Sequence, residues 1–340
     1  MEETIRSVKS ALRYLFLTAC LIPIESAWAE SILYISHGNI YSVNPRTTFA
    51  RVIVECPPQN QISSILPLPQ SKRLLYALQE INKDSASSVW IANLDGKNSR
   101  KLMDYGPGRI SLDDHSPDEK AIVYTALRND SFSIIHLKLD GSQPRRKRGG
   151  FSPCFINDTT VAFLGLPAVE GFCYHQILKW YPDAGDLDTL SNRPDLCLRI
   201  LSSMPRWKKL AVVGSDSFTG MREFIDVLNV DGEILNSGVA QSIGLIRFLD
   251  KPRFSPDGNS LLWCFEHWLN LADLTTGQSK RLAEKLDPDY FRWSPDGKLI
   301  AYTGQRQNDW SEIHLIDADG KHKRRLTQSR AREFQLYWIK

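Results

Sequence analysis

The sequence is poor in the features by which many functional classes are recognised. Its 42 Lys and Arg residues nearly balance its 39 Asp and Glu residues, so the formal net charge is only +3. Such a charge gives no electrostatic footprint for nucleic acid. No Cys-x-x-Cys, His-x-His or His-Glu-x-x-His pattern is present, and neither is a Gly-x-Ser-x-Gly elbow or an EF-hand loop. We therefore assign no catalytic, cofactor-binding or metal-binding residue.

Long hydrophobic runs are also missing outside the N-terminal region. Residues 14–24 are mainly apolar but too few to span a bilayer comfortably. Basic residues precede this run, and Ala27-Trp28-Ala29 follows it with the small-x-small pattern of a cleavage site. We predict a signal peptide over residues 1–29, cleaved between Ala29 and Glu30. The mature chain would then be periplasmic or secreted, with no transmembrane span.

Two alternatives to cleavage at Ala29 stay open. The first is an uncleaved membrane anchor formed by the same apolar run. The second is a lipoprotein, because Leu17-Thr18-Ala19-Cys20 resembles a bacterial lipobox in which Cys20 is acylated. The residues that follow Cys20 are apolar, whereas lipoprotein tethers are usually polar, so we favour cleavage before Glu30.

Cysteine is sparse, and its count limits the disulfides. Removal of the leader leaves five cysteines: Cys56, Cys154, Cys173, Cys197 and Cys264. An oxidising compartment allows one or two disulfides, and an odd count leaves at least one thiol outside any intramolecular pair. We expect Cys264 to be a small buried hydrophobic residue. A pair among Cys154, Cys173 and Cys197 would staple the most divergent part of the chain.

What the sequence does contain is a repeat, clearest between Tyr290 and Thr327. Its turn Ser294-Pro295-Asp296-Gly297 combines a proline that fixes φ with a glycine at a positive-φ position. A second turn, Asp319-Gly320, is typical of a β-hairpin. These turns separate four expected strands, at 291–293, 299–303, 313–316 and 324–327. A lone four-stranded sheet exposes both faces, so the unit needs copies of itself to pack against.

Copies of this unit recur through the whole chain. Aligned on the proline of the first turn, the anchors fall at positions 69, 117, 156, 205, 256 and 295, with steps of 39 to 51 residues. Steps of this size suit one propeller blade each. The segment 334–338 resembles a first strand and then stops, and 32–54 supplies three strands without a first one. We therefore predict a last blade built from both termini, which removes exposed sheet edges.

These observations predict an all-β fold, a propeller of seven four-stranded blades over residues 30–340, with six blades as the alternative. The motif F/W-S-P-D-G followed by I-x-L-x-D-x-D-G and R-R-L-T resembles the WD-like repeat of TolB-like β-propellers. The resemblance is strongest at 116–148, 251–283 and 290–327 and weakest at 150–191. TolB itself has six blades and a preceding α/β domain for which this chain has no room. The resemblance implies an envelope-associated propeller.

Charged and aromatic residues recur at fixed places in the repeat, which assigns most of them to structure. The basic run Arg145–Arg148 has counterparts in three other repeats, so we expect a solvated strand. The aspartates of the second turns, Asp95, Asp140, Asp231 and Asp319, are expected to shape hairpins. His136 and His314 occupy matching third-strand positions, which favours packing. Packing between blades is also expected of four tryptophans, at positions 90, 263, 293 and 338.

The function hypothesis follows from this distribution. We favour an exported, non-enzymatic propeller that binds another protein or an envelope component, without cofactor or metal. The alternative is a carbohydrate-active lyase or hydrolase whose acid and base residues meet at the central channel from distant blades. The loops between second and third strands vary most, and they share one face that often carries binding.

Overall fold

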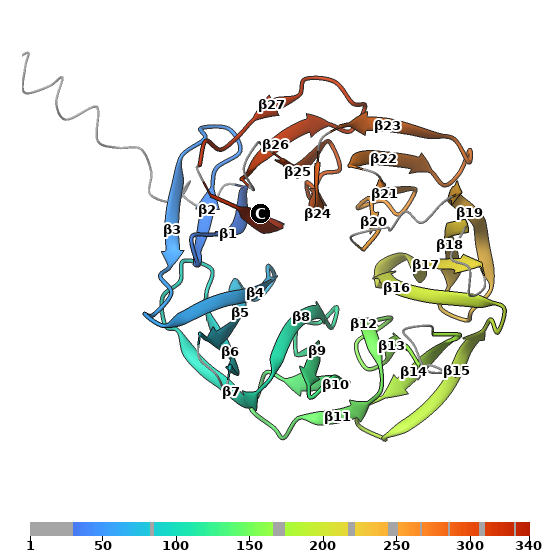
Figure 1. The fold of residues 1–340 in the computed structure, drawn as a ribbon, viewed down its shortest axis with the longest axis horizontal. Coiled ribbons are helices and arrows are strands. Elements are labelled where there is room, and N and C mark those ends of the chain that lie inside the picture. Colours follow the sequence, from blue (N-terminus) through green and yellow to red (C-terminus); the bar gives the residue numbers. More distant parts are fainter. Residues whose placement is uncertain are drawn as a thin grey trace, which may run out of the picture.

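The computed structural model shows a ring of seven four-stranded antiparallel sheets around a central channel (Figure 1). The prediction of a seven-bladed all-β propeller is confirmed, and the six-bladed alternative is wrong. In the part of the chain described, no helix is long and apolar enough to cross a membrane. The structure describes residues 30–81, 85–165, 174–216, 222–243, 251–265, 267–284, 286–305, 310–329 and 331–340.

Each of six blades is formed by four consecutive strands, and the first of the four lies nearest the channel. Blade 1 contains β4 (Asn60–Leu68), β5 (Arg73–Glu80), β6 (Ala86–Asn93) and β7 (Arg100–Pro107). Blade 2 contains β8 (Arg109–His115), β9 (Ala121–Arg128), β10 (Ser131–Lys138) and β11 (Arg145–Arg148). Blade 3 contains β12 (Phe151–Phe155), β13 (Val161–Leu164), β14 (Gln176–Tyr181) and β15 (Asp186–Asn192). Blade 4 contains β16 (Leu196–Met204), β17 (Lys209–Asp216), β18 (Arg222–Asn229) and β19 (Ile234–Ile243), with the 3-10 turn Pro205–Trp207 after β16. Blade 5 contains β20 (Arg253–Phe254), β21 (Ser260–Phe265), β22 (Trp268–Asp273) and β23 (Ser279–Ala283). Blade 6 contains β24 (Leu286–Trp293), β25 (Leu299–Gln305), β26 (Ser311–Asp317) and β27 (Arg324–Arg325).

Blade 7 joins the two ends of the chain, as the sequence predicted. Its strand order is β28 (Glu333–Ile339), β1 (Ser31–Ser36), β2 (Asn39–Val43) and β3 (Ala50–Val54). In Figure 1 the red β28 lies on the channel side of the blue β1. The two strands pair antiparallel, with Ser31 opposite Ile339 and Ser36 opposite Glu333. The C-terminal strand is thus a core element that closes the ring.

The Ser-Pro-Asp-Gly turns owe their shape to one set of side-chain bonds. In blade 6, Ser294 Oγ donates to Asp296 Oδ1 at 2.7 Å and accepts the backbone N–H of Leu299 at 2.9 Å. Gly297 adopts φ of 72°, where a Cβ would be strained. The same serine and aspartate bonds recur in blades 2 and 5. The motif is therefore a repeated device that joins first to second strands.

The turn of blade 2 departs from the motif at its fourth position, where Glu119 replaces glycine. Glu119 adopts φ of 54°. Its carboxylate accepts the backbone N–H groups of Gln70 and Ser71, in the equivalent turn of blade 1, at 2.9 and 2.7 Å. These bonds to a neighbouring blade offset the strain of the left-handed backbone.

Core packing lies mainly between neighbouring blades. One cluster joins Trp263 of blade 5 to Val227 of blade 4, and another joins Trp338 of blade 7 to Ile313 of blade 6. Trp293 donates from Nε1 to the carbonyl of Arg253 in blade 5 at 3.2 Å. Trp90 stacks on Tyr76 within blade 1 and contacts the cluster that joins blades 7 and 1. The predicted packing role of these four tryptophans is confirmed.

The recurring charged and histidine positions also have structural roles. The basic runs lie on exposed outermost strands, including β11, where charge discourages edge-to-edge pairing. His136 packs edge-on against Phe155 and Trp180, and His314 stacks on Tyr302. Three of the hairpin aspartates accept a backbone N–H two residues on, at Asp95, Asp140 and Asp319. In the fourth hairpin Asn229 takes this role instead of Asp231, a correction to the expected pattern.

The cysteines divide into two states. Cys197 is disulfide-bonded, whereas Cys56, Cys154 and Cys264 are reduced thiols. Cys154 therefore drops out of the candidate pairs, and Cys173 lies outside the described residues. Cys264 is 1% exposed on β21, which confirms its expected place in the core.

Candidate functional site

The strands that line the channel carry β-bulges at similar levels. The ladder shifts by one residue within β4, β8, β12, β16 and β28. A bulge leaves one residue outside the ladder and redirects its side chain. Ser152 and Gln335, at two of these bulges, adopt φ of 52° and 56°. The bulges therefore free polar groups of the innermost strands for other partners.

Polar side chains at or next to these bulges link four successive pairs of blades. Gln335 of blade 7 accepts the backbone N–H of Ile65 in blade 1 at 2.8 Å. Ser64 of blade 1 accepts that of Leu112 in blade 2 at 3.1 Å.

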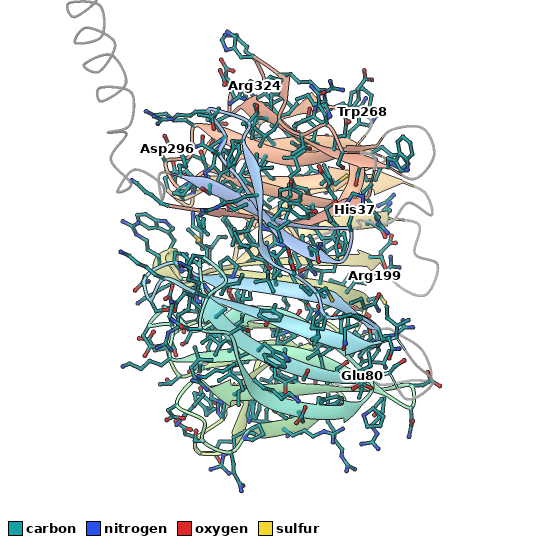
Figure 2. All side chains as sticks on the ribbon, turned by 90° about the vertical axis from the view of Figure 1, so that its left-hand side faces the viewer. His37, Glu80, Arg199, Trp268, Asp296 and Arg324 are labelled. Atoms are coloured by element: carbon teal, nitrogen blue, oxygen red, sulfur yellow. The ribbon has the colours of Figure 1, made fainter. Side chains whose placement is uncertain are left out.

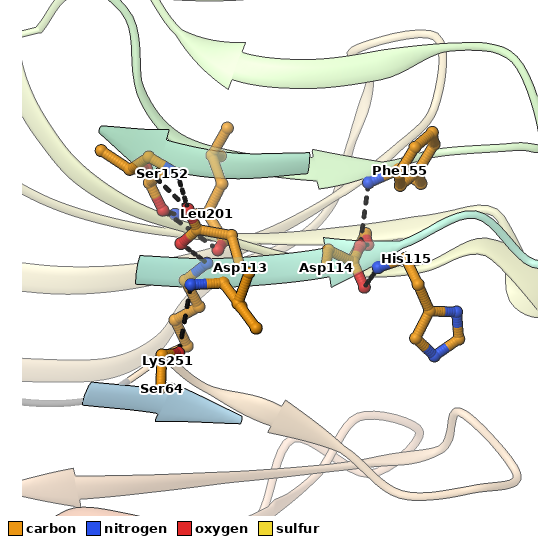
Figure 3. A network of polar contacts seen from close by, with 11 residues as sticks. Ser64, Asp113, Asp114, His115, Ser152, Phe155, Leu201 and Lys251 are labelled. Carbon is orange, nitrogen blue, oxygen red and sulfur yellow. Dashed lines mark hydrogen bonds and ion pairs between the residues drawn. The ribbon is translucent and has the colours of Figure 1, made fainter. Parts of the chain in front are cut away.

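The same pattern continues into blades 3 and 4. Asp114 of blade 2 accepts the backbone N–H of Phe155 in blade 3 at 2.8 Å, and Ser152 of blade 3 accepts that of Leu201 in blade 4 at 2.9 Å (Figure 3). Each of four successive blade junctions thus has one bond from a backbone N–H to a side chain. These bonds satisfy N–H groups inside the ring.

An ion pair adds a bond across the channel. Asp113 of β8 lies 3.0 Å from Nζ of Lys251, which lies two residues before β20 of blade 5 (Figure 3). The second oxygen of Asp113 accepts the backbone N–H and the hydroxyl of Thr125 at 2.7 and 2.6 Å. The side chains of Lys251 and Asp113 are only 20% and 10% exposed. The pair therefore ties blade 2 to blade 5 in a largely desolvated place.

Burial dominates the electrostatics of this cluster. It raises the pKa of Asp114, although the hydrogen bonds from Phe155 and His115 act in the opposite direction. For Lys251, burial lowers the pKa, but the charge of Asp113 more than offsets this and raises the pKa above its ordinary value. Burial, aided by the charge of Asp114, also raises the pKa of the Cys154 thiol to about 12, so this cysteine is not a nucleophile at neutral pH.

The chemistry open to the cluster follows from these bonds. Both oxygens of Asp113 and both oxygens of Asp114 accept hydrogen bonds from fixed donors. A general base must instead reach a proton of a substrate. The arrangement therefore acts as a lock that holds the innermost strands together. Among the described residues, no three His, Cys, Asp or Glu side chains are grouped so as to hold a metal ion.

Sequence reasoning missed this cluster, although a signal was present. The three residues before the turn are Phe291-Arg292-Trp293 in blade 6 but Asp113-Asp114-His115 in blade 2. Two adjacent acids at positions that hold Phe291 and Arg292 in blade 6 indicate a special position. The predicted cleavage residue Ala29 and the alternative lipidation residue Cys20 lie outside the described residues, and Glu30 is the first described residue.

Comparison with known proteins supports the fold. No protein-family profile and no curated protein matches this sequence. Among solved structures, an oligogalacturonate lyase in complex with manganese matches with a TM-score of 0.65 at 13% identity, over 84% of this chain and 85% of that chain. A putative 6-phosphogluconolactonase from Bacteroides uniformis gives 0.62 at 13% identity, over 91% and 99%. TolB from Acinetobacter baumannii gives 0.52 at 14% identity, over 91% and 82%. The TolB-like propeller fold is confirmed, and identities this low carry no activity with them.

Proposed function

We propose that this chain is an exported propeller that binds another protein or a component of the cell envelope and performs no catalysis itself. The main support for the proposal is that Asp113 and Asp114 in the channel are used in bonds between blades. Asp113 and Asp114 hold Lys251 and backbone N–H groups in place. Because the polar residues of the channel stabilise the ring, we assign function to the variable loops of one face.

The two faces of the ring differ in these loops. Turns between first and second strands, marked by Asp296, lie on the left in Figure 2, and turns between second and third strands, marked by Glu80 and Trp268, lie on the right. We call the latter the loop face. Ile81, directly after β5 on this face, is 63% exposed. A single exposed apolar side chain does not mark a binding site by itself, so Ile81 serves only as a probe of this face. We assign partner binding to the loop face because its loops vary most between the blades.

Affinity capture from envelope extract tests the assignment. We expect wild-type protein to retain a specific partner, and Ile81→Asp to weaken that retention about tenfold or more, because a buried charge opposes an apolar contact. Leu235→Asp is the matched control, since Leu235 is 48% exposed on the outer strand β19. Equal retention by both variants would reject the loop face as the binding surface.

Export has separate support in the residues 1–29 and in the disulfide at Cys197, because disulfides persist in oxidising compartments. N-terminal sequencing of protein from its native host should begin at Glu30. A blocked, lipid-modified Cys20 would replace this proposal with a lipoprotein, and an intact Met1 would remove both.

A carbohydrate-active lyase or hydrolase with its site in the channel is the alternative. The fold shared with oligogalacturonate lyase brings this alternative forward, and Asp113 and Asp114 are channel acids that it could use. Steady release of product from polygalacturonate, abolished in Asp114→Asn, would overturn the binding proposal. We expect no release above the buffer control.

A further inference from the structure

A second polar site lies away from the channel, in a cavity of about 450 Å³ on blade 4. Its volume falls within the range of small-molecule sites, about 300–1,000 Å³. The cavity is lined by the connection between β15 and β16, by the end of β17, by the first half of β18 and by the middle of β19. Strand pairing within blade 4 does not require such a hollow, and specific residues create it.

The cavity is opened by a wide bulge in β19. Ile225 pairs with Ala240 and Val227 pairs with Asn236, which leaves residues 237–239 opposite Asp226 alone. The carboxylate of Asp226 stabilises this bulge, because it accepts the backbone N–H of Gly238 at 2.8 Å. Gly238 adopts φ of 60°, and the Gln241 side chain occupies the space that a Cβ would need. The outer strand therefore bends away from β18 at a fixed place.

Arg193 forms the charged wall of this cavity. Its Nη1 lies 2.6 Å from Asp226, and its guanidinium lies 5.4 Å from the centre of the Phe224 ring. These two contacts fix the plane of the guanidinium. The Arg193 side chain is 20% exposed. A guanidinium has five N–H donors, and the described residues engage it through Nη1 alone. Because Arg193 lines the cavity, its remaining donors are available to a ligand there.

Further groups of the cavity narrow the class of ligand. Arg222 is exposed at the mouth, beside Asp216, which accepts its backbone N–H at 2.9 Å. Two cations therefore stand with three acids, Asp216, Glu223 and Asp226. Glu223 is already paired with Arg199 at 2.5 Å. Such a mixture disfavours a multiply charged anion, which the acids repel. It suits a ligand with one carboxylate, for the arginines, and neighbouring hydroxyl or ammonium donors, for the acids and Gln241.

We propose that this cavity binds a small hydroxy- or amino-carboxylate, whose carboxylate is held by the guanidinium fork of Arg193 and by Arg222. The mouth of the cavity lies on the loop face, because Asp216 ends β17 and Arg222 begins β18, but the proposal rests neither on the channel lock nor on partner binding at that face. Neither proposal needs the other, so each can fail alone.

The test is isothermal titration calorimetry of the full mature chain with D-gluconate, L-glutamate and inorganic phosphate. We expect saturable binding of gluconate or glutamate, and the better ligand identifies the hydroxy or the amino class. Arg222→Gln should weaken it about tenfold or more, as expected for loss of a hydrogen bond to a charged group. Arg193→Lys should do the same, while it keeps a cation beside Asp226 and so spares the fold. Arg145→Gln, on the exposed strand β11, is the matched control and should bind as wild type.

Three outcomes would overturn the proposal. The first is no saturable binding of either carboxylate by wild-type protein. The second is equal affinity in wild type, Arg222→Gln and Arg193→Lys, which would place the binding elsewhere. The third is tighter binding of phosphate than of both carboxylates, which would show a site for compact, multiply charged anions.

Discussion

The fold disfavours the charged form of Glu333. It lies on β28 and is fully buried, where its Oε2 accepts the hydroxyl of Thr327 at 2.5 Å and the backbone N–H of Ile313 at 3.0 Å. Burial raises its pKa from 4.5 to about 7, although these bonds act in the opposite direction. The ring is thus closed by a strand that carries a carboxyl group protonated below neutral pH.

This residue predicts a pH dependence of a definite sign. Because the folded-state pKa is raised, the folded state binds the extra proton, and stability falls as pH rises from about 4.5 to about 7. The loss is about 3 kcal/mol, from about 1.4 kcal/mol for each pKa unit. Glu333→Gln keeps an acceptor oxygen without the charge. We therefore expect its free energy of unfolding to rise relative to that of wild type as pH rises across this window. Urea denaturation of both proteins between pH 4.5 and 8 measures the difference, and a difference that does not change with pH would refute the assignment.

The Asp113–Lys251 pair gives a second prediction for single residues. Removal of one partner from a buried pair costs about 3–5 kcal/mol, and because this pair is partly exposed we expect about 2–3 kcal/mol for Lys251→Met. In a double-mutant cycle, the coupling energy between Asp113→Asn and Lys251→Met should be about 1 kcal/mol or more.

The exposed pair Lys138–Asp183 provides the control for this cycle. Lys138→Met should change the free energy of unfolding by less than about 1 kcal/mol. If Lys251→Met is as stable as wild type, the pair does not lock the channel and the structural role of Asp113 is wrong.

Among the elements, the Ser-Pro-Asp-Gly turn is the one that the sequence predicts best. Ser294 is fully buried, and its hydroxyl serves as donor and acceptor at once. Ser294→Ala should cost about 1–2 kcal/mol, as expected when the hydrogen bonds of a buried hydroxyl are lost. Ser71 is exposed in the matching turn of blade 1, and its hydroxyl makes one long bond of 3.4 Å. Ser71→Ala should change the midpoint of chemical denaturation little, and similar losses at both positions would contradict this view of the motif.

The contrast between turns and bulges explains what the sequence reveals. Turns depend on neighbouring residues with special backbone preferences, so Asp319-Gly320 and the proline anchors predict them, and with them the blades. The bulges insert one residue into strands of five to nine residues, too short a stretch for a change of period to be seen. The bonds of Gln335 and Asp113 join positions 270 and 138 residues apart, and only the closed ring brings these partners together.

For the whole molecule, the shared blade makes both chain ends part of one cooperative unit. Deletion of residues 334–340 would remove Leu336, Trp338 and Ile339, which are 0%, 8% and 3% exposed. Each buried large side chain contributes about 1.5–3 kcal/mol, and the sum approaches the whole stability of a typical domain, about 5–15 kcal/mol. We expect the truncated protein to unfold or aggregate, as followed by thermal denaturation. Deletion of the exposed Lys340 alone should have little effect, and near-wild-type stability of the longer truncation would show that β28 does not close the ring.

The central claim is that this ring binds a partner through its loop face. A photo-crosslinking residue placed at position 81 in cells of the native host tests it directly, with position 120, on the opposite face, and position 235, on the outer edge, as references. We expect a discrete adduct of higher mass after irradiation when the residue is at position 81, and none when it is at position 120 or 235. No adduct at position 81, or the same adduct at all three positions, would contradict it.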